Sequence, residues 1–151
     1  MSKKVKRLFE GFQTEHYDVD ITLDQEAMTF TGRVRILGRK VGRPTNRLTF
    51  HQKGLHISHA IITRHDKQGA TEIELERINH HASFNEVRLH TEASLPAGKY
   101  DIVMEYNGKI TRQMEGVYPC NFTHDGHNKQ LIATQFESHH AREAFPCIDE
   151  P

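Results

Sequence analysis

The chain has 151 residues, with 20 Lys and Arg against 20 Asp and Glu, so its formal net charge is zero. This length fits one domain of ordinary size, and 36% hydrophobic residues are enough for a thin core. No run approaches the roughly 18 apolar residues of a transmembrane helix, and the basic N-terminus leads into no apolar segment typical of a secretory signal. We expect no membrane association, and the two cysteines, Cys120 and Cys147, favour a reducing cytoplasm over a disulfide framework.

Apolar and polar side chains alternate along most of the chain, which is typical of half-buried strands. Turn signals recur about every 8–12 residues, as in antiparallel β proteins, and Asn107-Gly108 is typical of a tight hairpin turn. Only residues 138–147 predict a helical turn, which Pro146 ends. The sequence predicts an all-β fold, an antiparallel sandwich or saddle-like open sheets, with strands near residues 17–24, 30–36, 48–50, 55–61, 73–75, 87–89, 100–106, 117–118 and 131–136.

Charge is distributed unevenly along the chain. Residues 27–65 contain eight Lys and Arg and no acid, whereas residues 66–92 are net acidic. A basic block can bind nucleic acid or anionic lipid, or its strands can pair with acidic neighbours across a sheet. We favour the second interpretation and expect no nucleic acid or membrane partner, because the block lacks the interleaved aromatic residues of single-strand binders.

The 12 histidines are the unusual feature of the composition, but they form no recognisable metal motif. His80-His81 and His139-His140 are adjacent, and neighbouring residues of a strand point to opposite faces. A structural zinc site needs four ligands at set spacings, usually including thiolates. We therefore expect surface histidines and no metal site in this chain; weak zinc binding by them is the alternative. Cys147 follows Phe145-Pro146, a context that predicts burial and disfavours use as a nucleophile.

The end of the chain carries the most specific signal. Residues 134–151 read T-Q-F-E, then A-R, then A-F-P-C-I-D-E-P, and closely resemble a signature of the aminopeptidase N family of zinc metallopeptidases. Weaker resemblances occur upstream, in the same order as in the family. They are H-Y-D-V at 16–19, F-T-G-R-V at 30–34, L-T-F-H at 48–51 with L-H-I at 55–57, L-P-A-G-K-Y at 95–100, Y-N-G-K-I at 106–110 and M-E-G-V-Y at 114–118. The similarity therefore covers residues 12–151.

The resemblance implies a domain organisation. Residues 1–11 would be a basic lead, and residues 12–151 the N-terminal β domain of such an enzyme, lacking its last strands. The catalytic domain, with its H-E-x-x-H helix and bound zinc, would lie beyond this sequence, which contains no His-Glu dipeptide. We therefore expect no catalytic residues, no metal ligands and no cofactor in this chain, and the absent catalytic domain as its partner.

The resemblance also implies a substrate site at Gln135 and Glu137, on a strand-end loop that reaches the catalytic cleft. The Glu137 carboxylate can bind the charged α-ammonium of a peptide, and Gln135 can both accept and donate hydrogen bonds. In a strand these two residues share a face and Phe136 points the other way. If the amine is held at a fixed distance from zinc, only the first peptide bond of the substrate would reach the metal.

Other signature residues are expected to be architectural. Arg142 should pair with a carboxylate near Asp149 or Glu150, and residues 145–147 should pack into the core. The sequence departs from the family where Glu143 replaces a basic or apolar residue, and near residues 138–140, where a proline or small residue is common. A second hypothesis is a stand-alone β-sandwich binding or scaffold module without peptidase activity. A reading frame continuing past Pro151 into H-E-x-x-H would favour the enzyme domain.

Overall fold

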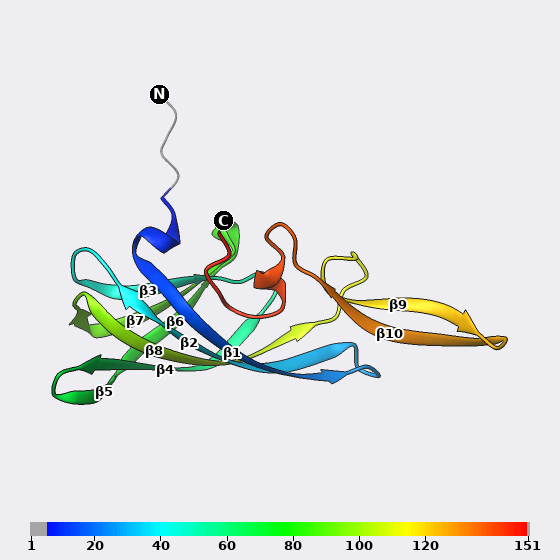
Figure 1. Ribbon diagram of the computed structural model, residues 1–151, viewed down its shortest axis with the longest axis horizontal. Helices are drawn as coiled ribbons and strands as arrows, with labels where there is room; N and C mark the ends of the chain where they lie inside the picture. The colour runs from blue at the N-terminus through cyan, green and yellow to red at the C-terminus, as the bar shows by residue number, and fades with distance from the viewer. Residues whose placement is uncertain (1–5, 151) are drawn as a thin grey trace, which may run out of the picture.

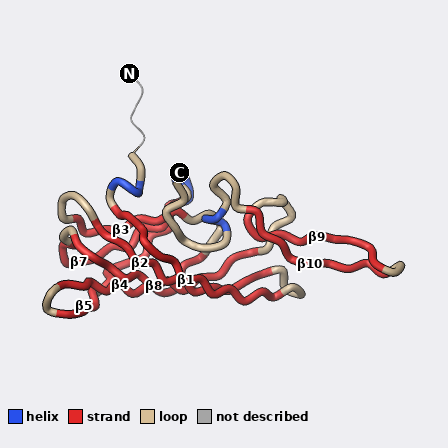
Figure 2. The backbone as a smooth tube through the Cα atoms, in the orientation of Figure 1, coloured by secondary structure: helices blue, strands red, loops and turns tan. Residues whose placement is uncertain are grey.

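The computed structural model describes residues 6–150, and the regular structure of this part of the chain consists mainly of antiparallel strands (Figures 1 and 2). The predicted all-β fold of open sheets is therefore confirmed. Three short 3-10 helices, each of three residues, complete the described secondary structure: η1 (Leu8–Glu10), η2 (Ala82–Phe84) and η3 (Ala141–Glu143). The helical turn predicted near the end of the chain corresponds to η3.

The strands form two sheets and a separate hairpin. The five-stranded sheet has the order β1 (Phe12–Asp24), β2 (Thr29–Lys40), β8 (Gly98–Lys109), β4 (His56–Asp66) and β5 (Gly69–Ile73). The three-stranded sheet has the order β3 (Thr45–His51), β7 (Glu86–Leu95) and β6 (Leu75–His81). The hairpin contains β9 (Gly116–His124) and β10 (His127–Gln135) and extends away from both sheets (Figure 1).

The core contains side chains from both sheets. They come from strands in which buried and exposed residues alternate. In β8, Tyr100, Ile102, Met104 and Tyr106 are buried, as their shared face in the sequence pattern indicates. Apolar residues of the smaller sheet join the same buried cluster. The β9–β10 hairpin contributes little beyond Val117, and most of its side chains are exposed.

Three of the predicted turns connect consecutive strands in the structure. They are the connections near residues 65–69, 95–98 and 124–128. At the last of them, Asp125 and Gly126 both have positive φ, the backbone conformation that a two-residue hairpin of the primed type requires.

The hairpin turn expected at Asn107-Gly108 is wrong. Both residues lie inside β8, opposite Thr31 and Phe30 of β2. Gly108 is needed here for space, since a Cβ at this position would lie 2.9 Å from Cε1 of the Phe30 ring and 2.8 Å from Cδ2 of Leu55. The glycine therefore provides room for an aromatic ring from the neighbouring strand, and the chain does not turn.

The basic strand β2 lies between two strands that carry acids. Asp18 and Asp20 of β1 pair in register with Arg35 and Arg33, and Arg35 Nη2 donates to Asp101 Oδ2 of β8 at 2.6 Å. This hydrogen bond and the charge of Asp101 raise the pKa of Arg35. Pairing of opposite charges across adjacent strands is confirmed, although these acids lie outside the acidic segment 66–92.

β1 begins at Phe12, directly after the residues expected to form the basic lead. Residues 1–5 of the expected basic lead, and Pro151 of the signature, lie outside the described residues. The described part of the lead forms η1, whose Leu8 and Phe9 amides donate to the Glu150 carboxylate at 2.9 and 3.1 Å. Within residues 6–150, no helix has the length and apolar character needed to cross a membrane.

We predict that Gly32→Ala destabilises the domain by about 1–3 kcal/mol, the usual cost of overpacking. Gly32 lies opposite Tyr106, and a Cβ there would approach Cε2 of the buried tyrosine ring to 2.7 Å. Urea unfolding measures the change. Gly11→Ala is the matched control, because its added Cβ would meet only the Leu8 carbonyl oxygen at 3.6 Å. Equal unfolding free energies for the two variants would contradict the steric argument.

Candidate functional site

The signature segment that follows β10 has little regular structure and is held by hydrogen bonds to the sheets. After β10 ends at Gln135, the chain makes a turn, forms η3 and returns to the end of β3. There His51 and Cys147 form an isolated antiparallel bridge, in which His51 N donates to Cys147 O at 2.7 Å and Cys147 N donates to His51 O at 3.1 Å. The segment is therefore fixed at both ends.

Arg142 and Asp149 join the two sides of this segment. Arg142 Nε donates to Asp149 Oδ2 at 3.0 Å, and Nη2 donates to the Asp149 carbonyl oxygen at 2.9 Å. Both side chains are largely shielded from water, with 13% and 12% of their surfaces exposed. The predicted pairing of Arg142 is confirmed, and it closes the loop that contains η3.

Residues of the upstream similarities contact the same segment. The Tyr17 hydroxyl accepts a hydrogen bond from Ile148 N at 2.9 Å, and burial raises the pKa of Tyr17. His51 Nδ1 accepts from Asp149 N at 3.1 Å. Burial, assisted by the charge of Arg142, lowers the pKa of His51, which favours the neutral ring that this hydrogen bond requires.

Aromatic packing and burial hold the apolar residues of the segment. Phe145 makes edge-to-face contacts with Tyr17 and Phe136, each with ring centroids 6.0 Å apart. Pro146 and Cys147 are buried and Phe145 is half-buried, so the expected packing of residues 145–147 is confirmed. Burial raises the pKa of the Cys147 thiol, which makes a nucleophilic role less favourable still.

Gln135 and Glu137 are both exposed, immediately beside this anchored segment. Gln135 is the last residue of β10 and pairs with Gly116 of β9, whereas Glu137 lies in the turn after the strand. The strand-based expectation that the two share a face therefore does not apply, because the strand ends before Glu137. They remain adjacent, since Glu137 N donates to Gln135 Oε1 at 3.1 Å. The expected apolar anchor between them is confirmed by Phe136, which is half-buried against Phe145.

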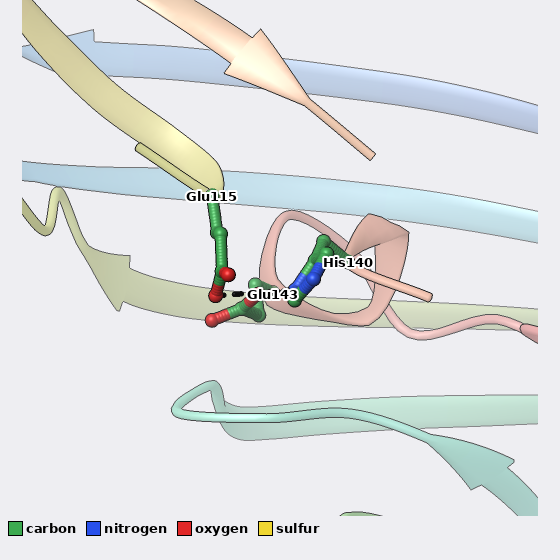
Figure 3. A group of neighbouring side chains, drawn as sticks. All are labelled: Glu115, His140 and Glu143. Carbon is green, nitrogen blue, oxygen red and sulfur yellow. Dashed lines mark hydrogen bonds and ion pairs between the residues drawn. The ribbon is translucent and has the colours of Figure 1, made fainter. Parts of the chain in front are cut away.

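A second polar cluster lies beside this turn. Figure 3 shows Glu115, from the loop before β9, pointing toward His140 and Glu143 near η3. His140 Nδ1 lies 2.6 Å from Glu143 Oε2 and 3.6 Å from Glu115 Oε2. Lys53 Nζ lies 3.5 Å from the other Glu143 oxygen. Sequence reasoning missed this group because its carboxylates are 28 positions apart; the only signal was the departure from the family at Glu143 and residues 138–140.

Several other histidines have ordinary structural contacts. His80 Nε2 accepts from Ile57 N at 2.9 Å and its ring stacks on His56 at 5.2 Å between centroids. Burial lowers the pKa of His80, in agreement with its role as an acceptor. Among residues 6–150, Glu115, His140 and Glu143 form the one group of three or more His, Cys, Asp and Glu with the spacing of metal ligands.

Comparison with known proteins agrees with this architecture. Residues 13–151 match the model of the Peptidase M1 N-terminal domain. Aminopeptidase N from Lactococcus lactis subsp. lactis is 37% identical over all of this chain and 16% of its own length. Aminopeptidase N from Lactobacillus delbrueckii subsp. lactis is 35% identical over 97% of the chain and 16% of its own length. Endoplasmic reticulum aminopeptidase 1 from Rattus norvegicus is 33% identical over 96% of the chain and 16% of its own length.

The fold and the anchored signature define an N-terminal β domain of the aminopeptidase class. Because the match covers residues 13–151, this chain belongs to the Peptidase M1 N-terminal domain family. The resemblance read from the sequence is therefore confirmed. The chain spans about one sixth of the length of the relatives it matches, 16% in the examples above.

We predict that Arg142→Met lowers the free energy of unfolding by about 2–4 kcal/mol, because it leaves the shielded Asp149 carboxylate without its charged partner. Urea unfolding followed by circular dichroism measures this change. Arg39→Met is the matched control: Arg39 Nε lies at the same 3.0 Å from Glu15 Oε1, but 60% and 44% of these side chains are exposed. An exposed pair contributes at most about 1 kcal/mol. Similar losses in the two variants would contradict the proposed role of burial.

Proposed function

We propose that this chain binds the free α-amino group of a peptide substrate for a zinc-dependent aminopeptidase. Membership of the family and the names of the relatives support the reaction class. The observation that carries the site is the position of Glu137: an exposed carboxylate in a turn whose two sides are fixed by β10 and by the His51–Cys147 bridge. Ion pairing with an ammonium group needs an accessible carboxylate held in place in this way.

The roles of the two site residues follow from their chemistry. The Glu137 carboxylate accepts charge-assisted hydrogen bonds from the substrate ammonium group. The Gln135 amide accepts from the same amine or donates to a substrate carbonyl; its Oε1 already accepts from Glu137 N, which orients the amide. These residues position the substrate and break no bond.

The catalytic zinc would be bound by the remainder of the protein. The sequence lacks any His-Glu dipeptide and so cannot supply an H-E-x-x-H helix. We therefore propose that the chain packs on a catalytic domain, works with zinc held there, and has no peptidase activity alone. A cytoplasmic location is part of the proposal and rests on two free cysteines.

In the full-length enzyme, we expect Glu137→Ala to lower kcat/KM for peptides with a free N-terminus by roughly 10- to 100-fold, the effect of losing one hydrogen bond to a charged group. Steady-state kinetics with an aminoacyl anilide measures this. Glu72→Ala is the control, since Glu72 is an exposed glutamate on β5, the edge strand of the five-stranded sheet. An unchanged kcat/KM for Glu137→Ala would refute the amine-binding role.

We also expect the purified 151-residue chain to hydrolyse no aminoacyl anilide, with or without added zinc. The physical reason is that the sequence contains no H-E-x-x-H motif, whose glutamate acts on the metal-bound water in peptidases of this kind. The full-length enzyme, assayed at the same molar concentration, is the positive control. Zinc-dependent turnover that copurifies with the chain and disappears with chelator would contradict the proposal.

A further inference from the structure

Glu115, His140 and Glu143 bring three ligand atoms of metal-binding type together outside the proposed substrate site. His140 Nδ1 and one carboxylate oxygen of each glutamate all lie within 4.8 Å of one another (Figure 3). Glu115 comes from the loop before β9, His140 ends the turn after β10, and Glu143 lies in η3, which follows that turn. Two segments that are separate in the sequence therefore converge on one point.

The backbone is arranged so that this convergence is possible. Gly116 has a φ of 65°, and a Cβ there would lie 2.7 Å from the Glu143 Cβ. Glycine is thus required both for the left-handed conformation and for the close approach of Glu143. On the other side, Glu143 N donates to His140 O at 3.1 Å, and His140 N donates to Phe136 O at 2.9 Å.

Two of the three side chains are shielded from water. The exposed fractions are 15% for His140 and 11% for Glu143, against 44% for Glu115. Glu115 therefore forms the open side of the cluster, through which an ion and a water molecule can enter. Lys53 Nζ contacts Oε1 of Glu143, and Oε2 faces His140. One oxygen of each carboxylate is directed to the shared point.

Two of the three separations are close to those around a first-row divalent ion, and the third, between the two carboxylate oxygens, is within 4.8 Å. Ligand atoms about 2.0–2.2 Å from zinc in a tetrahedral site lie roughly 3.3–3.6 Å apart. The 3.6 Å separation of His140 Nδ1 and Glu115 Oε2 is close to this value. The 2.6 Å separation of His140 Nδ1 and Glu143 Oε2 must open by less than about 1 Å. Zinc binds both His nitrogen and Glu oxygen, and open zinc sites have three protein ligands with water in the fourth position, so one imidazole, two carboxylates and a water complete a tetrahedral set.

We propose that Glu115, His140 and Glu143 bind a divalent transition-metal ion of the zinc type. The ion links the loop before β9 to the turn after β10, and so holds the turn that contains Glu137. The sequence-based expectation of no metal site considered local histidine motifs and could not include carboxylates that folding brings to His140.

Calorimetric titration of the chelator-treated 151-residue chain with zinc chloride tests the proposal. We expect one zinc ion per chain with a dissociation constant on the order of 1 µM or lower. Glu115→Gln, His140→Asn and Glu143→Gln should each weaken binding at least ten-fold. His124→Gln is the control, because His124 lies opposite His127 in the exposed hairpin and offers an alternative site. Absence of stoichiometric binding, or its loss in the control alone, would overturn the proposal.

Two further measurements separate metal binding from a structural role. Lys53→Met removes the ammonium group beside Glu143 and should tighten zinc binding, because the carboxylate no longer shares its charge; weaker binding would contradict the assignment of Glu143 as a ligand. Zinc should also raise the Tm of the parent chain and not that of Glu115→Gln. Glu115 is the most exposed of the three side chains, so we expect this variant to keep the fold. Both readouts are independent of peptidase activity, so failure here leaves the proposed function untouched.

Discussion

The backbone bridge between His51 and Cys147 is the constraint on which the site depends. The segment from Phe136 to Glu150 contains only η3 as regular structure, and ordering irregular chain costs about 1–2 kcal/mol per residue in backbone entropy. The bridge adds a pair of hydrogen bonds between this segment and β3, at a position where Cys147 is buried. Because β10 fixes the opposite end, Gln135 and Glu137 have defined positions although both are exposed.

Contacts with this segment explain why short similarities to the family are scattered through the sequence. Tyr17 supplies a hydroxyl to Ile148 N, His51 supplies backbone and ring acceptors, and Gly116 supplies space beside Glu143. Each residue is far from the signature in sequence and in contact with it, or with its backbone, in the fold. The three similarities that contain Tyr17, His51 and Gly116 are thus the complementary half of one structural unit, which local periodicity alone does not reveal.

Alternation along the chain predicted best the strands that have one buried face, as β8 shows through Tyr100, Ile102 and Met104. It did not separate β5 from β6, because the strand predicted near residues 73–75 spans the end of one and the start of the other. It was not sufficient at Asn107-Gly108, where a glycine accommodates the ring of Phe30 from a strand about 80 positions earlier. Sheet order was also beyond reach, since β8 pairs with β2 and β4 through long-range contacts. For the same reason Gln135 and Glu137 could be predicted only through family resemblance, and Glu115 could not be predicted at all.

An exposed side chain usually has few contacts that fix its position. In this domain the polar contacts that fix the turn are made by neighbouring side chains that are shielded from water. Glu137 itself has little burial to hold it, but Arg142 and Asp149 are shielded from water within the same segment. Glu143 similarly connects Lys53 of the loop after β3 with His140 of the turn. Such shielded contacts are screened less by salt than exposed ones, so they can hold the turn while its outer carboxylate stays free for a ligand. The position of an exposed binding residue is therefore fixed by the contacts of its shielded neighbours.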